Sequence, residues 1–202
     1  MAGESCVPRA LFGGAISTAF PARFQDVSDI RQVPDHQEAF VDPARDESLI
    51  FELLDLKIEV DDADSALWFL RDIANEQDAG DDLVMEHTGT LGLAALTLGE
   101  APAVATTAVG HLAVSKGRQS REARNFIRVY LANIRLKNAA TDVLITAYEP
   151  LLINPLSESA AAVAAGPAIP AEQAGCLPMS EIFKHAVMNF NVHDWNLFNG
   201  GP

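Results

Sequence analysis

The stretch NFIRVYLANIRLKNAATDVLITAYE, residues 125–149, decides the fold because it holds two strand patterns joined by a turn. In its first half, residues 125–137, apolar side chains alternate with larger polar ones. The alternating positions are Ile127, Val129 and Leu131 on one face, and Arg128 and Tyr130 on the other. A period of two is typical of a strand that buries one face. Residues 142–149 repeat the pattern after a gap of turn length, so the stretch predicts an antiparallel β-hairpin.

Further strands are predicted on the N-terminal side of this hairpin. Strong signals occur at residues 48–56, which carry Phe51, Leu53 and Leu54, and at residues 104–115. Weaker signals occur at residues 14–19, 37–42 and 83–87. Consecutive strands with short connections favour an antiparallel sheet.

Two helices are predicted, at residues 61–76 and 178–190. The first begins in a cluster of carboxylates, which suits the positive end of a helix dipole and can cap its free N–H groups. The second has Pro178 in its first turn, where proline is tolerated. Each helix has an apolar stripe that needs a sheet face to cover it. The stripes are Leu67, Leu70, Ile73 and Ala74 in the first helix, and Ile182, Phe183, Ala186, Val187 and Phe190 in the second. The prediction is an α+β fold, an antiparallel β-sheet flanked by helices.

The length of 202 residues suits a single domain, residues 1–202, with its own core. We expect residues 1–9 to be disordered. Residues 151–177 are rich in small residues and proline, and we expect them to form a long loop on that domain.

The formal net charge of −14 restricts the partners of this chain. Such a chain repels nucleic acid and anionic membranes and favours a basic protein partner. The charge is concentrated, since 17 of the 28 carboxylates lie between Asp35 and Glu86, with only Arg45, Lys57 and Arg71 among them. A merely solvated acidic face remains the simpler interpretation of composition alone.

Motifs for catalysis, metals and cofactors are missing. Asp26, Asp29, Asp35 and Glu38 lack the regular spacing of a calcium loop. The five histidines and two cysteines share no ligand spacing, and no phosphate-binding loop is present. We therefore expect no metal, no cofactor and no enzymatic activity. No apolar run reaches the ~20 residues that cross a bilayer.

A block near the N-terminus, LFGGAISTAFPARFQDVSDIRQVPDHQE at residues 11–38, carries a series of motifs. It opens with Phe-Gly-Gly-Ala, continues with Asp-Val-Ser-Asp, and closes with Arg-x-Val-Pro-Asp-x-Gln-Glu. This series closely resembles the Mog family, the Ran guanine-nucleotide release factors. His36 departs from the pattern, since asparagine is more usual there. Residues 42–50 and 141–146 also resemble family segments, and the extension after Leu151 looks more like plant-type members.

The resemblance implies both a fold and a function. The fold is an α/β/α sandwich like that of the P subunit of the photosystem II oxygen-evolving complex. The function is binding of the GTPase Ran, release of its guanine nucleotide, and support of nuclear protein import. We expect a monomer in the nucleus and cytoplasm that acts by binding alone.

The Ran-binding surface of the family is acidic and includes this N-terminal block. Carried onto this chain, the resemblance implicates Asp26, Asp29, Arg31, Pro34, Asp35, His36, Gln37 and Glu38. Two alternatives stay open. Asp26 and Ser28 are turn-forming residues that can have a purely structural function. The protein can also be an acidic binding module for another basic partner, such as a trafficking adaptor without nucleotide-release activity.

Overall fold

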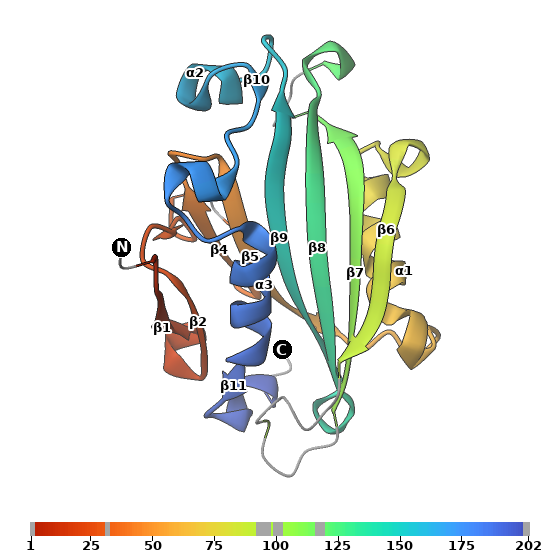
Figure 1. The fold of residues 1–202 in the computed structure, drawn as a ribbon. Coiled ribbons are helices and arrows are strands. Elements are labelled where there is room, and N and C mark those ends of the chain that lie inside the picture. Colours follow the sequence, from red (N-terminus) through yellow and green to blue (C-terminus); the bar gives the residue numbers. More distant parts are fainter. Residues whose placement is uncertain (1–2, 31–32, 92–97, 99–102, 116–119, 200–202) are drawn as a thin grey trace.

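The computed structural model describes residues 3–30, 33–91, 98, 103–115 and 120–199, and Figure 1 shows their arrangement. The strands are β1 Cys6–Leu11, β2 Ile16–Pro21, β3 Gln25–Asp26, β4 Gln37–Asp42, β5 Glu47–Asp55, β6 Val84–Leu91, β7 Ala103–Val114, β8 Asn125–Leu136, β9 Thr141–Ile153, β10 Gly166–Pro167 and β11 Asn191–Val192. The helices are α1 Ser65–Glu76, α2 Ser159–Val163 and α3 Met179–Met188. Within these residues, no helix combines the length and apolar character needed to cross a bilayer.

The predicted hairpin forms the centre of the main sheet. Strands β8 and β9 pair in antiparallel register from Leu136 and Thr141 at the turn to Phe126 and Leu152 at the far end. The sheet order is β3-β4-β5-β9-β8-β7-β6, with β10 pairing on β9. Its described pairs are antiparallel, because each strand returns beside its neighbour. The antiparallel prediction is confirmed.

Helices cover both faces of this sheet. Helix α1 packs against β7 and β8 on one face, and α3 packs against β8 and β9 on the other. In Figure 1, α3 lies in front of the sheet and α1 lies behind β6 and β7. The layer with α3 also holds a small sheet in the order β1-β2-β11. The predicted α+β fold with a helix-covered sheet is therefore confirmed, with a three-stranded sheet added to one layer.

Each side of the sheet has its own hydrophobic core. The α3 side contains the predicted stripe of α3 and an aromatic cluster in which the Phe20 ring lies 4.9 Å from Phe40 and 5.9 Å from Phe51. The α1 side buries Ala66, Phe69 and Leu70. The predicted stripe of α1 is wrong at one position: Ala66, and not Leu67, faces the sheet, because the buried row follows positions 66, 69, 70 and 74.

The predicted carboxylate cap of the first helix is also wrong. The side chain of Asp64, the N-cap residue of α1, accepts no hydrogen bond from the first turn of the helix. Instead the Ala66 N–H donates to Thr106 Oγ1 of β7 at 3.1 Å, and the Ser65 and Thr106 hydroxyls lie 2.9 Å apart. The sheet itself therefore satisfies the start of the helix, and the acidic residues are left for other contacts.

Two predicted irregular segments contain regular structure. Residues 1–9 were expected to be disordered, but β1 starts at Cys6 and pairs with Pro21 of β2. Residues 151–177 were expected to be a loop, but β9 continues to Ile153, and α2 and β10 follow. Strand β1 forms by pairing with β2, and the end of β9 by pairing with β8 and β10, so backbone pairing extends both strands beyond what their composition indicates.

A buried ion pair fastens the central hairpin to the segment that leads into α1. Arg135 is 2% exposed and Asp142 is 0% exposed. Arg135 Nε donates to Asp142 Oδ1 at 2.9 Å, and its other nitrogens donate to the carbonyls of Lys57 and Val60. Asp142 Oδ2 accepts the Lys57 N–H at 2.8 Å. The pair thus satisfies backbone groups of the segment between β5 and α1.

Replacement of Arg135 with methionine is expected to destabilise the protein. The change keeps the apolar volume but leaves the Asp142 carboxylate buried without its cation, which costs about 3–5 kcal/mol in comparable cases. Urea denaturation measures the free energy of unfolding. Arg121→Met is the matched control, because Arg121 and its partner Asp78 are exposed, and it should leave the unfolding midpoint unchanged. Equal loss in both variants would contradict the structural role of the buried pair.

Candidate functional site

The Asp-Val-Ser motif of the N-terminal block fastens a loop to the edge of the main sheet. Asp26 Oδ1 accepts the Ser28 N–H at 2.9 Å, which closes a turn. Ser28 Oγ then accepts the Ala39 N–H of β4 at 3.0 Å, and the Val27 N–H donates to the Ala39 carbonyl. These short polar side chains replace strand partners that the loop does not provide. Asp26 therefore has a structural contact while its carboxylate remains exposed.

The Pro-Asp-His motif forms the turn that leads into β4. The Gln37 N–H donates to the Pro34 carbonyl at 2.9 Å, and the His36 carbonyl accepts the Leu53 N–H of β5 at 2.8 Å. Pro34, Asp35 and His36 are all exposed. The backbone of this turn is thus fixed to the sheet, and its side chains project into solvent. Arg31, the remaining member of the loop prediction, lies outside the described residues.

Strand alternation sends the last two motif residues to opposite faces of the sheet. Gln37 pairs with Glu52, and Glu38 pairs with Phe51. Since Phe51 belongs to the core on the α3 side, Glu38 also faces that side. Gln37 and Glu52 face the α1 side. The eight predicted residues therefore do not form a single cluster.

Glu38 holds the Phe-Gly-Gly turn between β1 and β2. Its Oε1 accepts the Phe12 N–H at 2.8 Å. Phe12, Gly13 and Gly14 have φ values of 49°, 67° and 90°, a left-handed run that glycine adopts readily and phenylalanine does not. The hydrogen bond from Glu38 stabilises the strained residue of this turn. It explains why the first and last motifs of the block belong together in space.

Three carboxylates gather on this side of β4. Burial raises the pKa of Glu38 above its ordinary value, the Phe12 N–H opposes that increase, and the charges of Asp26 and Asp29 add to it. Arg9, which interacts electrostatically with Asp26, has other partners: its guanidinium lies 4.7 Å from the Phe20 ring centroid and donates to the carbonyls of Pro21 and Phe24. The three carboxylates form an acidic patch with no ion pair among the described residues.

A second acidic group, on the α1 side, includes two residues that sequence analysis missed. Gln37 Nε2 donates to Glu52 Oε1 at 2.8 Å. Burial raises the pKa of Glu52, and the charge of Glu76 at the end of α1 raises it further, while Gln37 and His36 lower it. Glu52 can be identified only when the register of β4 with β5 is known, because this register places Glu52 opposite Gln37. No local signal places Glu76 beside it, because the contact depends on where α1 packs.

The carboxylates of both acidic groups can attract a cation. Neither contains a nucleophile paired with a base. In the part of the chain that the structure describes, no three His, Cys, Asp or Glu side chains are placed to hold a metal ion. The site therefore offers exposed or partly buried carboxylates on a fixed backbone to a basic partner.

Replacement of Glu52 with glutamine is expected to stabilise the fold at neutral pH. Because the folded-state pKa of Glu52 lies above its ordinary value of 4.5, ionisation is less favourable in the folded protein than in the unfolded chain. The resulting stability is present below the ordinary pKa and is lost as the pH rises through the folded-state pKa. Glutamine retains an oxygen for Gln37 and cannot ionise. Urea denaturation at about pH 4 and about pH 7 should show a gain only at the higher value, and a less stable variant there would mean that the fold needs the charge.

Comparison with known proteins identifies the relatives of this chain. Residues 9–150 match the family model described as Ran-interacting Mog1 protein. The Ran guanine nucleotide release factor of Danio rerio is 37% identical over 155 residues, which cover 76% of this chain and 83% of that protein. The nuclear import protein MOG1 of Saccharomyces cerevisiae is 28% identical over 206 residues, covering 93% of this chain and 83% of that protein.

A solved structure has the same fold. The crystal structure of the Saccharomyces cerevisiae Ran-binding protein Mog1p superposes with a TM-score of 0.64 and 22% sequence identity, and the match covers 96% of this chain and 99% of that chain. The resemblance that the N-terminal block predicts is confirmed: this chain belongs to the family of Ran-interacting Mog1 proteins.

Proposed function

We propose that this protein binds the small GTPase Ran, promotes release of its guanine nucleotide, and thereby supports nuclear protein import. The names of its relatives support the assignment. The observation that carries it is the pair of acidic groups around the family motif, which have carboxylates in excess of cations and a backbone fixed to the sheet. The protein acts by binding, without covalent chemistry and as a monomer, in the nucleus and cytoplasm where its partner is used.

Release by binding follows from thermodynamic linkage. A protein that binds nucleotide-free Ran more tightly than loaded Ran must weaken nucleotide binding by the same factor. GTPases of this class hold the β- and γ-phosphates with a lysine of the phosphate-binding loop. Carboxylates brought to that site attract the lysine and repel the phosphates. The acidic groups can supply both effects.

The geometry suggests how the predicted residues divide this work. Asp35 and His36 belong to the turn before β4 and are exposed. Glu38, Asp26 and Asp29 form the patch on the α3 side, and Gln37 orients Glu52 on the other. Pro34 shapes the turn, and we include Arg31 from the family motif. These assignments remain part of the proposal.

Removal of two charges from the motif is expected to weaken Ran binding without unfolding the protein. We choose Asp35→Asn with Glu38→Gln, because glutamine keeps an oxygen that can accept the Phe12 N–H. Charged interface residues of this kind commonly cost more than about 2 kcal/mol, so the Kd for nucleotide-free Ran should rise by about 10- to 100-fold. Titration calorimetry gives the affinity, and release of a labelled nucleotide from Ran gives the activity.

The control variant also removes two negative charges, but outside the motif. Glu172 and Glu181 are exposed, and Glu172→Gln with Glu181→Gln should bind Ran like the wild type. Unchanged affinity in the Asp35 and Glu38 variant would remove these residues from the interface. Tight Ran binding without any nucleotide release would leave an acidic binding module and not a release factor.

Ionic strength should act mainly on the association rate. The net charge of −14 attracts a basic partner over distances comparable to the Debye length, which falls as salt is added. The association rate with Ran should therefore fall steeply from about 50 to about 300 mM salt, with a smaller change in the dissociation rate. Stopped-flow fluorescence measures both rates. A flat association rate would mean that the acidic surface is only solvated.

A further inference from the structure

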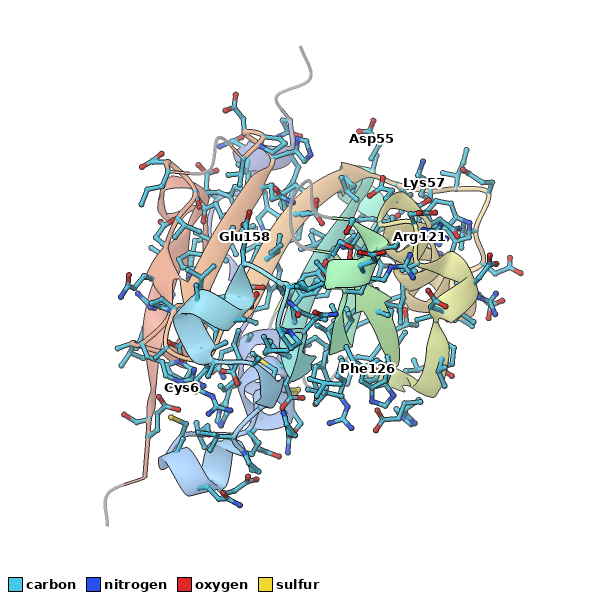
Figure 2. All side chains as sticks on the ribbon, turned by 90° about the horizontal axis from the view of Figure 1, so that it is seen from above. Cys6, Asp55, Lys57, Arg121, Phe126 and Glu158 are labelled. Carbon is cyan, nitrogen blue, oxygen red and sulfur yellow. The ribbon has the colours of Figure 1, made fainter. Side chains whose placement is uncertain are left out.

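The α1 face of the main sheet contains an open cleft that adjoins the candidate site and shares Glu76 with it. Helix α1 packs on β7 and β8, and the cleft lies beside it with a volume of about 820 Å³. The end of α1, with Arg121 and Arg124, forms one wall, and the β4–β5 turn, with Ala162 of α2, forms the other. Figure 2 looks down on this end of the sheet and shows Arg121 on the right and the α2 helix, which follows Glu158, on the left.

The floor of the cleft is apolar. It includes Ile50 of β5, Ile127 of β8 and the ring of Tyr148 on β9. Ile127 is 7% exposed, so the floor is continuous with the core beneath α1. Ligand sites are commonly concave, have apolar floors, and occupy about 300–1,000 Å³. This cleft has room for one large apolar side chain and its neighbours.

The wall of the cleft at the end of α1 favours a positive charge. Five of the described lining residues are aspartate or glutamate and two are arginine. Asp42 and Glu47 pair with Arg23, which lies outside the lining, so the charge available to a ligand comes mainly from Glu76. Both arginines are already bound to carboxylates, Arg121 to Asp78 at 2.5 Å and Arg124 to Asp82 at 2.6 Å. Glu76 is exposed at the end of α1, and the last turn of this helix contains no basic residue. The negative end of the helix dipole therefore adds to the charge of Glu76.

The cleft and the candidate site share strands β4 and β5. The pairs Gln37–Glu52, Ala39–Ile50 and Val41–Ser48 follow one another on the same face. Gln37 lies about 13 Å from Val41, given the rise of about 3.3 Å per strand residue. A standard protein interface buries about 800 Å² on each partner and involves about 20–30 residues. A partner that contacts Asp35 and Glu52 would therefore reach the cleft.

We propose that this cleft is a second docking site for Ran, and that it takes a segment in which a large apolar side chain lies next to a lysine or arginine. The proposal rests on the function proposed above. The apolar side chain packs on Ile50 and Tyr148, and the cation lies against Glu76 and the end of α1. Asp35 and Glu52 at one point and the cleft at another then hold the partner along the α1 side of the sheet.

Two substitutions test the cleft without touching the motif. Ser48 lines the cleft, and Ser48→Trp fills it without changing the charge. Glu76→Lys reverses the charge of its wall. Titration calorimetry with nucleotide-free Ran should show a Kd at least about tenfold higher for each variant. The effect of Ser48→Trp should persist at high salt, since it is steric. Glu181→Lys, the same charge reversal on α3 across the sheet, should change the Kd less than about threefold.

The chemistry of the docked segment is tested by cross-linking. A benzoylphenylalanine at position 48 should cross-link to a Ran peptide with a basic residue beside a large apolar one, identified by mass spectrometry. Cross-linking to a peptide without this pair would overturn the proposal.

The outcomes separate this proposal from the proposed function. If the wild type does not bind Ran, the proposed function fails, and the cleft proposal fails with it. Ser48→Trp decides between the two, because Glu76 also belongs to the second acidic group of the candidate site. If the Asp35 and Glu38 variant binds weakly while folded Ser48→Trp binds like the wild type, only the cleft proposal is overturned. Ala162→Trp, in the wall formed with the β4–β5 turn, where the side chain is exposed, replaces Ser48→Trp if thermal melting shows that the latter does not fold.

Discussion

The buried pair of Arg135 and Asp142 is the constraint on which the functional face depends. Both residues lie on the central hairpin, and together they bind the backbone of the segment that leads into α1. A buried arginine without these acceptors would be costly, so the segment is held in a single position. Helix α1 then covers β7 and β8 and leaves the β4–β5 side of the same face open. The cleft and the contact between Glu52 and Glu76 both follow from that placement.

Hydrogen bonds hold the motifs of the N-terminal block to one another and to β4, so the block is not a continuous binding loop. Glu38 crosses to the Phe12 turn, Ser28 crosses to Ala39, and the Pro34 turn closes on Gln37. Because β4 alternates, neighbouring motif residues face opposite sides of the sheet. The block and Glu52 of β5 together therefore present carboxylates on both sides of one edge of the sheet, with Asp35 and His36 at the tip between them. A partner can straddle this edge, which a flat acidic surface would not allow.

The limits of sequence reasoning follow from the range of the interactions. The hairpin of β8 and β9 was predictable because alternation and turn length are local properties, and the stripe of α3 was predictable for the same reason. The start of α1 was not, because its cap comes from Thr106, about forty residues away. Strand β1 exists through pairing with β2, and the end of β9 through pairing with β8 and β10, which the composition of these segments does not indicate. Glu52 and Glu76 escaped notice because neither belongs to a motif, and only register and helix packing bring them together.

Glu38 and Glu52 ionise at a cost in free energy that a basic partner would reduce. Burial raises the pKa of each, and neighbouring carboxylates raise it further. Ionisation of both carboxylates is therefore less favourable in the folded protein than in the unfolded chain. A basic partner would stabilise the ionised forms and lower both pKa values, so binding would release protons wherever the two carboxylates are partly protonated. A phosphate would act in the opposite direction. The same burial that makes ionisation of the two carboxylates less favourable also strengthens their attraction to a cation, because charges interact more strongly where water is partly excluded.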